Sequence, residues 1–388
     1  MAGTQQIIFC MEKNENRLSE VARLFLKLGI IGFGGPAAHI AMMKTEVVTK
    51  RQWMTEQHFL DLIGATNLIP GPNSTEMAIH IGQERAGWKG LIVAGACFIM
   101  PAVLITAVFA WLYKQYGQLP AVQPFLYGIT PAIIAIILSV LYPLAKRSLK
   151  STELKLIGLI TLVLSLLQLN EIYIMFGAGF FAMGLYAVRK QYFNNHLSSI
   201  LPFTILQINQ KGFLSPANLH LFLVFLKIGA ILYGSGYVLF AFLDAELVMK
   251  GLLSRQQLVD AIAVGQFTPG PVFSSVTFIG YQINGWTGAV VSTAGIFLPS
   301  FVFVALLNPL VKKMRGSAIF STFLDAVNVA SVAIILAVCF QMGKDSFTGW
   351  RTIVIAVAGL LIALKFPKIN TAFIVLGGAL AGYLLSLI

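Results

Sequence analysis

The sequence predicts an all-α polytopic membrane protein made of two inverted-topology repeats, with about ten transmembrane helices and two broken re-entrant segments. Composition, long apolar stretches and an internal repeat lead to this prediction. Of the 388 residues, 57% are hydrophobic and only 11% are charged, whereas soluble proteins average about 45–50% and 25%. A soluble fold could not cover its surface with so few charges, which excludes a cytosolic enzyme, a nucleic-acid-binding protein and a disordered regulator.

The basic residues indicate membrane topology rather than a nucleic-acid partner. The net charge is +12, and the 27 lysines and arginines are scattered singly between apolar stretches. Cys10, Cys97 and Cys339 are far apart, which argues against a disulfide framework, a zinc site or a redox dithiol. Residues 1–20 are polar and lack the pattern of a cleaved signal peptide.

Apolar stretches long enough for membrane helices fill most of the chain. A bilayer core needs about 20 helical residues, and no alternating pattern typical of an outer-membrane barrel is present. The long stretches cover 21–43, 57–83, 88–113, 121–145, 219–243, 258–281, 286–311 and 319–343, and shorter ones cover 152–168, 172–188, 349–365 and 370–388.

An internal repeat relates the two halves of the chain. Its clearest pair is Pro70-Gly71-Pro72 and Pro269-Gly270-Pro271, and the offset between matching positions stays between 198 and 200 residues. Further matches are Phe25–Gly29 with Phe225–Gly229, Glu46 with Glu246, Asp61 with Asp260, Gly87-Trp88 with Gly285-Trp286, and Pro101 with Pro299. The two Gly-Trp pairs predict turns at the membrane interface, anchored by the tryptophans. We therefore divide the chain into an N-terminal tail (1–20), a first repeat (21–190), a linker (191–217) and a second repeat (218–388).

The Pro-Gly-Pro motifs decide the predicted orientation of the halves. Two prolines around a glycine break a helix, so Pro70, Pro72, Pro269 and Pro271 mark hairpin breaks. If 57–83 and 258–281 are re-entrant, each half has five crossings and the halves are inverted. Loops 44–56, 84–89, 146–156, 189–211, 312–318 and 365–368 then lie inside and carry most of the basic residues, as the positive-inside rule requires. Both termini would lie outside.

The residues after each break predict an oxyanion site between the halves. The first turn of a helix has unpaired N–H groups and a partial positive charge, and polar residues occupy both first turns. Candidate ligands are Asn73, Ser74 and Thr75 in the first half and Ser274 and Ser275 in the second, with Gly71 and Gly270 allowing close backbone approach. Asn67 and Thr268 are polar residues just upstream. Alternatively, these small residues serve only helix packing.

Three kinds of charged residue lie within apolar stretches. Lys27 and Lys227 are equivalent and could bind a dianion together, unless they only extend to the membrane surface. Glu76 has Ser275 as its repeat equivalent, and His80 follows it by one helical turn. Burial of an unpaired glutamate would favour its protonated form, so Glu76 and His80 are candidates for proton coupling, although helix capping could also explain Glu76.

The remaining charges have expected structural roles. Asp61 and Asp260 lie nine residues before the first proline of each break, where a gate or interface role is expected near the membrane surface. Glu46 and Glu246 are expected to pair with loop cations such as Lys50 or Arg255. Asp325 could be a proton relay or a residue of the first helical turn.

The motifs of both halves resemble the chromate ion transporter family in its long, two-domain form. The resemblance rests on Phe33–Pro36, on the run Asn67–Glu76, on Ala86-Gly87-Trp88, and on Thr268–Pro271 in the second half. It implies proton-driven chromate efflux from the bacterial cytoplasm across the inner membrane, hence an antiporter conferring chromate resistance. It also implies cross-recognition of sulfate.

We therefore expect a secondary transporter, not an enzyme, that works by alternating access. A sulfate or other oxyanion importer or exchanger, and an anion channel, are the alternatives. No flavin, haem or metal motif is visible in the sequence, so no cofactor is expected. The expected partners are chromate, sulfate-like oxyanions, protons and the lipid bilayer, with no nucleic acid and with a homodimer left open.

Overall fold

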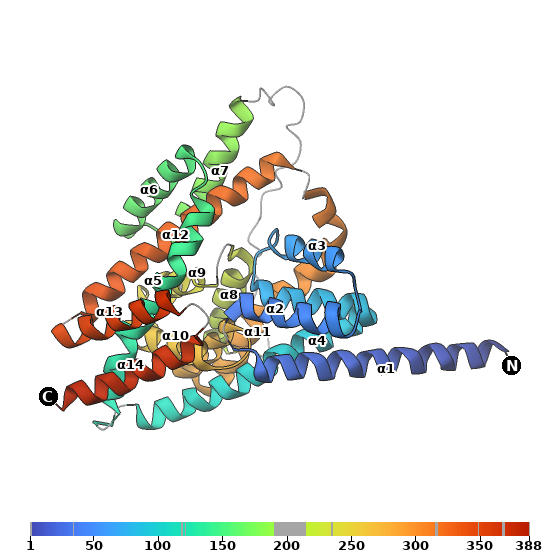
Figure 1. Cartoon of the computed structure of the whole chain (residues 1–388), viewed down its shortest axis with the longest axis horizontal. Coiled ribbons are helices and arrows are strands. Elements are labelled where there is room, and N and C mark those ends of the chain that lie inside the picture. Colours follow the sequence, from blue (N-terminus) through green and yellow to red (C-terminus); the bar gives the residue numbers. More distant parts are fainter. Residues whose placement is uncertain are drawn as a thin grey trace.

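The computed structural model describes residues 2–33, 35–117, 119–120, 122–189, 215–233, 236–314, 317–347, 349–366 and 369–387. Within these ranges every regular element is a helix (Figure 1). Five segments of the described chain are long and apolar enough to cross a membrane, which confirms the predicted all-α polytopic class. They are Asn73–Tyr116, Gln123–Ser148, Glu171–Arg189, Val272–Leu306 and Ala318–Lys344.

The two halves have the same order of elements, except that the second half has an additional short 3₁₀ helix, η4. The first half consists of α1 (Ala2–Ile31), α2 (Gly35–Lys44), η1 (Thr45–Lys50), α3 (Glu56–Thr66), α4 (Asn73–Tyr116), α5 (Gln123–Ser148), α6 (Thr152–Leu166) and α7 (Glu171–Arg189). The second consists of α8 (Pro216–Ile231), α9 (Val238–Leu243), η3 (Asp244–Val248), α10 (Arg255–Phe267), η4 (Val272–Ser274), α11 (Ser275–Met314), α12 (Ala318–Ser346), α13 (Trp350–Lys365) and α14 (Thr371–Ser386). Most of the predicted linker lies outside the described residues.

The first apolar stretch of each half, 21–43 and 219–243, is not one helix but a broken hairpin. Nζ of Lys27 lies 3.1 Å from Oε1 of Glu46. Nineteen residues of straight helix would separate them by about 28 Å, so the chain must turn back between them. The glycine-rich sequence at the turn explains the break, since Gly35 adopts a φ of +80° that other residues rarely reach.

The Pro-Gly-Pro segment of the first half also turns back on itself. Oε1 of Glu84 lies 2.7 Å from Nε2 of His58, so the end of the segment returns to its start. Gly71 (φ +135°) and its equivalent Gly270 (φ +91°) both have backbone angles suited to glycine. Together with the prolines, this backbone ends α3 and α10 and starts the following helices.

A second sharp turn divides α4 and α11, each of which contains two helices. Gly87 (φ 63°) and Gly285 (φ 59°) occupy equivalent positions in these turns. A Cβ on Gly82 would collide with the carbonyl of Gly90, so the two parts of α4 touch just beyond the turn. Trp88 is 69% exposed beside its turn. The predicted turns at Gly87 and Gly285 are therefore confirmed.

The second parts of α4 and α11 pack against each other in antiparallel fashion. Gly95 lies against Phe301, whereas the carbonyl oxygen of Ala110 accepts a hydrogen bond of 2.9 Å from Gln282, which precedes the Gly285 turn. We call the two ends of the helical assembly the Gly87 end and the Gly285 end. The second part of α4 runs from the Gly87 end to the Gly285 end, and the second part of α11 runs the opposite way.

The halves also exchange their last helices. In the first half α6 and α7 pack on α12, and in the second half α13 and α14 pack on α5 (Figure 1). Gly128 of α5 lies against Gly378 and Gly382 of α14, where small residues let the two backbones approach closely. Each half thus covers the central helix of the other.

The expectation that both termini lie on one side is wrong. Nη2 of Arg85 lies 2.6 Å from Oε2 of Glu20, which brings α1 into the assembly at the Gly87 end. The ring of Tyr383 stacks on Phe125 near the start of α5, with centroids 4.6 Å apart. Because α5 starts where α4 finishes, α14 ends at the Gly285 end.

Candidate functional site

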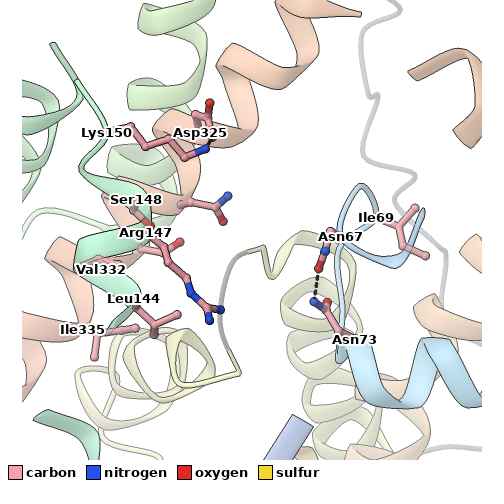
Figure 2. A pocket seen from close by; sticks show the side chains of 12 residues that line it. Asn67, Ile69, Asn73, Leu144, Arg147, Ser148, Lys150, Asp325, Val332 and Ile335 are labelled. Atoms are coloured by element: carbon pink, nitrogen blue, oxygen red, sulfur yellow. Dashed lines mark hydrogen bonds and ion pairs between the residues drawn. The ribbon is translucent and has the colours of Figure 1, made fainter. Parts of the chain in front are cut away.

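A polar cavity of about 360 Å³ lies between the first Pro-Gly-Pro break and the helices α5 and α12 (Figure 2). One wall comes from the break and the first residue of α4, and the other comes from the end of α5 and from α12. Its lining residues are Asn67, Ile69, Asn73, Leu144, Arg147, Ser148, Lys150, Asp325, Asn328, Ser331, Val332 and Ile335.

Asparagine amides form the polar side of the wall at the break. Nδ2 of Asn73 donates a hydrogen bond of 2.6 Å to Oδ1 of Asn67. On the opposite wall, Nζ of Lys150 lies 3.0 Å from Oδ1 of Asp325. This ion pair neutralises two of the three charged side chains in the lining, and Arg147 is the third. The cavity therefore carries one excess positive charge.

The cavity extends from the Gly87 end into the interior of the assembly. Arg147 and Lys150 lie where α5 ends, whereas Ser331 and Ile335 lie in the middle of α12. Oγ of Ser331 is 3.4 Å from the carbonyl oxygen of Tyr233, just after the break that ends α8. The cavity thus reaches the region where the broken segments of the two halves meet.

Each Pro-Gly-Pro loop is attached to the other half by one backbone hydrogen bond. The amide of Gly71 donates to the carbonyl oxygen of Leu232 over 2.8 Å, and the amide of Gly270 donates to that of Gly32 over 2.7 Å. Leu232 and Gly32 are equivalent in the repeat. The amides of Gly71 and Gly270 thus contact the opposite half, and their predicted close approach to a ligand stays a prediction.

The hydroxyl groups after the breaks are packed inside the protein. Ser74, Thr75, Ser274 and Ser275 are buried and do not line the cavity. Oγ1 of Thr106 donates to Oγ of Ser274 over 3.3 Å, which connects the two halves. Among the ligands predicted from the sequence, Asn73 alone lines the cavity within the described chain.

Glu76 is fully buried at the contact between the halves. Its Oε1 lies 3.5 Å from Oγ of Ser300 in α11, and a Cβ on Gly71 would collide with it. Oε2 of Glu76 and both ring nitrogens of His80 have no hydrogen-bond partner in the part of the chain described. The two predicted proton-coupling residues therefore form a buried polar patch without a cation.

Lys27 and Lys227 both pair with the glutamate that follows their hairpin. Nζ of Lys227 is 2.6 Å from Oε1 of Glu246, matching the pair of Lys27 and Glu46. Neither lysine lines the cavity, so direct oxyanion binding by the two lysines stays a prediction.

Glu46 forms ion pairs with three cations at the end of its hairpin. Besides Lys27, it contacts Arg51 and, as predicted, Lys50 at 3.1 Å. Burial alone would raise the pKa of Glu46, but hydrogen bonds from Arg51, Lys50 and Lys27 lower it to about 2. In the second half, Nζ of Lys250 lies 2.5 Å from Oε2 of Glu246.

The cation predicted for Glu246 has a different contact. Nε of Arg255 lies 3.1 Å from Oδ1 of Asp244. Asp325, for which the sequence left two roles open, forms its ion pair with Lys150 near the start of α12.

The second Pro-Gly-Pro break is closed by neighbouring helices. Asp260 is 2% exposed and accepts hydrogen bonds of 2.7 Å from Tyr113 and 3.0 Å from Gln256. Its repeat equivalent Asp61 is only partly buried. α10 packs on α5 and α14. Asp260 therefore lies at an interface between the halves, and its expected gate or interface role near the membrane surface stays a prediction.

A second cavity, of about 320 Å³, occupies the corresponding place in the second half. It is lined by Tyr127, Thr130, Arg255, Gln256, Val259, Met342 and Ser346. It stays beside the start of α10 and does not include Gln266 or Thr268 at the break, both of which are buried. The two halves thus expose their breaks differently.

Sequence reasoning missed the wall formed by α5 and α12. The signal was available, because Ala132–Val140 matches Ala330–Val338 with the same offset of 198 residues. Extending this match pairs Lys146 with Lys344 but Arg147 with Asp345. The positive charge of Arg147 therefore has no equivalent in the second half.

Comparisons with known proteins agree on one family. The sequence profile described as "Chromate transporter" matches residues 19–183 and again 219–383. The "Chromate transport protein" of Cupriavidus metallidurans is 30% identical over 371 residues, covering 94% of this chain and 92% of its own.

Two further relatives are a "Probable chromate transport protein" of Synechococcus elongatus and a "Chromate transport protein" of Pseudomonas aeruginosa. The first is 28% identical and covers 94% of this chain and 95% of its own length. The second is 27% identical and covers 93% and 90%. No solved structure matches the chain. Since the profile covers both halves, this multi-pass membrane protein belongs to the chromate transporter family.

Proposed function

We propose that the protein is a secondary transporter that exports chromate from the bacterial cytoplasm across the inner membrane by proton-coupled alternating access. The supporting observation is the difference between the two breaks. A cavity with excess positive charge reaches the first break from the Gly87 end, while α5 and α14 cover the second. This arrangement fits a carrier open to one side only.

We assign the Gly87 end to the cytoplasm. Basic residues are concentrated in the loops at this end, among them 44–56 and 146–156, and the positive-inside rule favours them inside. The antiparallel packing of the second parts of α4 and α11 supports halves that are inverted across the membrane. The cavity would then receive chromate from the cytoplasm, as export requires.

The substrate is a tetrahedral dianion in this proposal. Asn67 and Asn73 supply amide groups and Arg147 supplies the charge. Such groups recognise charge and shape, which chromate and sulfate share, so sulfate is expected to compete. The buried hydroxyls of Ser74, Thr75, Ser274 and Ser275 would take part only when the hairpins move apart.

Glu76 carries the coupled proton in this mechanism. A buried carboxyl group without a nearby cation has its lowest free energy in the neutral, protonated form. Glu76 also touches both the first break and Ser300 of the other half. A change in its protonation would therefore change the contact between the halves, with His80 one helical turn away.

Chromate uptake by everted membrane vesicles tests the proposal. In everted vesicles, export appears as uptake, and proton antiport predicts that an acidic lumen accelerates it. We expect saturable, sulfate-inhibited uptake with wild-type protein. E76Q should remove the acceleration by the proton gradient, whereas S275A, at the equivalent position, should keep this acceleration even where it lowers the uptake rate. Uptake indifferent to the proton gradient would contradict proton coupling, and single-channel currents would indicate a channel.

Accessibility labelling tests the inverted arrangement separately. Lys50 and Lys250 are equivalent positions, paired with Glu46 and Glu246. After replacement of the native cysteines, K50C and K250C should react with an impermeant thiol reagent from opposite faces of the membrane. Reaction from the same face would rule out inversion.

A further inference from the structure

We propose that Arg147 is the anion-binding side chain of the cavity and makes the first ionic contact with the transported oxyanion. The inference rests on the proposed function and deepens it, because it assigns the substrate contact to a residue of α5 outside the Pro-Gly-Pro motifs.

The first support is the position of the guanidinium. Figure 2 shows Arg147 extending from α5 into the space that separates this helix from Asn67 and Asn73. An anion between these walls would meet the guanidinium on one side and the asparagine amides on the other. Ser148 and Asn328 add further polar groups to the lining.

The second support is the charge balance of the cavity. Asp325 is the one carboxylate in the lining, and it is paired with Lys150 at 3.0 Å. Among the residues that the structure describes, no side chain forms a hydrogen bond or an ion pair with Arg147. Its charge is therefore available to a ligand, whereas Lys27 and Lys227 each form an ion pair with a glutamate.

The third support is the difference between the repeats. Lys146 and Lys344 match, as expected for basic residues with a common role at helix ends. At the next position the first half has Arg147 and the second has Asp345. If the fold required a basic residue at this position, both halves would have one. We therefore assign Arg147 a role that only the first half has.

The chemistry of arginine fits a tetrahedral oxyanion. A guanidinium presents several N–H donors in a planar fork and binds two oxygens of an oxyanion at once. A lysine at this place would supply the charge but not the paired hydrogen bonds. Substitution by lysine can therefore separate the two contributions.

The test compares three variants in reconstituted phosphatidylcholine vesicles, with sided chromate uptake and its KM as the readout. R147A should raise KM for chromate at least tenfold, because it removes both charge and hydrogen bonds. R147K should raise it about threefold to tenfold. K146A is the matched control, since it removes a neighbouring charge that does not line the cavity, and its KM should stay within twofold of wild type.

Chromate binding to detergent-purified protein gives a second measurement that does not depend on turnover. The dissociation constant should follow the same order, with monodisperse elution showing that the variants are folded. Wild-type KM in R147A, or equal effects of R147A and K146A, would overturn the assignment. A wild-type protein that neither binds nor transports chromate or sulfate would instead contradict the proposed function.

Discussion

The two Pro-Gly-Pro breaks share a sequence motif, a glycine with a positive φ and a backbone hydrogen bond to the opposite half, yet their surroundings differ. Asn67 at the first break lies in the wall of an open cavity, whereas its equivalent Gln266 is buried beneath neighbouring helices. Related sequences thus occupy two different environments within one molecule.

The difference lies in packing rather than in the loops themselves. α10 is covered by α5 and α14, and Tyr113, Asp260 and Gln256 form a hydrogen-bonded group beside it. At the first break, the equivalent space between the loop and α12 is the cavity. A carrier that exchanged these two packings would expose the second break and cover the first.

Substitution of the loop glycines should have the largest effect. Gly71 has φ +135°, and a Cβ there would collide with Glu76 and meet Oγ of Ser300 at 2.7 Å. We expect G71A to destabilise the protein by more than about 3 kcal/mol and to abolish transport, since strain and collision add. The measurement is the fraction of monodisperse protein and its unfolding temperature.

The equivalent G270A tests whether the loops matter equally. Its Cβ would meet that of Ala102 at 2.9 Å but no carboxylate. We expect a smaller loss of stability than in G71A. G177A, in a helix with open space around the glycine, is the control and should be neutral. Equal tolerance of alanine at positions 71, 270 and 177 would contradict the described loop geometry.

Thiol labelling should separate the breaks by about an order of magnitude. In a protein whose native cysteines are replaced, N67C should react rapidly with a water-soluble maleimide because the cavity reaches it. Q266C should react slowly because its site is buried. The check is the ratio of the two labelling rates in detergent and in vesicles. Similar rates would show that the two breaks exchange environments freely.

Removal of the Tyr113 hydroxyl should loosen the packing around the second break, with a smaller effect than the preceding substitutions. Y113F deletes the donor of the 2.7 Å hydrogen bond to buried Asp260, which costs about 1–3 kcal/mol. We expect labelling of Q266C to accelerate about fivefold or more in the Y113F background. Y116F, an exposed tyrosine on the same helix, should leave the rate unchanged. No acceleration in Y113F would remove this bond from the closure of the second break.

The smallest expected effect is a change in stability with pH. It comes from the ion pairs of Glu46 and Glu246, which both halves have. The pKa of Glu46 is about 2, below its ordinary value of 4.5, so the unfolded chain takes up its proton first as the pH falls. The stability that Glu46 contributes is therefore present above about pH 4.5 and lost towards pH 2.

Unfolding temperatures at pH 7 and pH 3 check this dependence. E46Q should lower the unfolding temperature slightly at pH 7, and the difference from wild type should shrink at pH 3. E246Q should behave similarly, since cations also lower the pKa of Glu246. A difference from wild type that grows on acidification would contradict the proposed charge pairing.

Features determined by local chemistry could be predicted from the sequence. The breaks at Pro70 and Pro269, the turns at Gly87 and Gly285 and the pairing of Glu46 with Lys50 all arise from residues near each other in the chain. The reversal at Gly32 was not predicted, because residues 21–43 form one apolar stretch in the sequence and hydropathy does not record a change of direction.

The cavity could not be predicted in the same way. Arg147 and Asn67 belong to segments about 80 residues apart, and only packing brings them to one space. Ser74 and Thr75 were plausible ligands because a first helical turn has unpaired donors. The adjoining helices bury them in this structure, which periodicity and spacing do not reveal.

The exchange of helices has a consequence for assembly. Since α6 and α7 rest on α12 while α13 and α14 rest on α5, neither half can finish folding before the other has been synthesised. The ribosome would have to synthesise much of the second half before α5 gained the helices α10, α12, α13 and α14 that pack on it. By the same logic, two separately expressed halves should find each other in the membrane and restore one working protein.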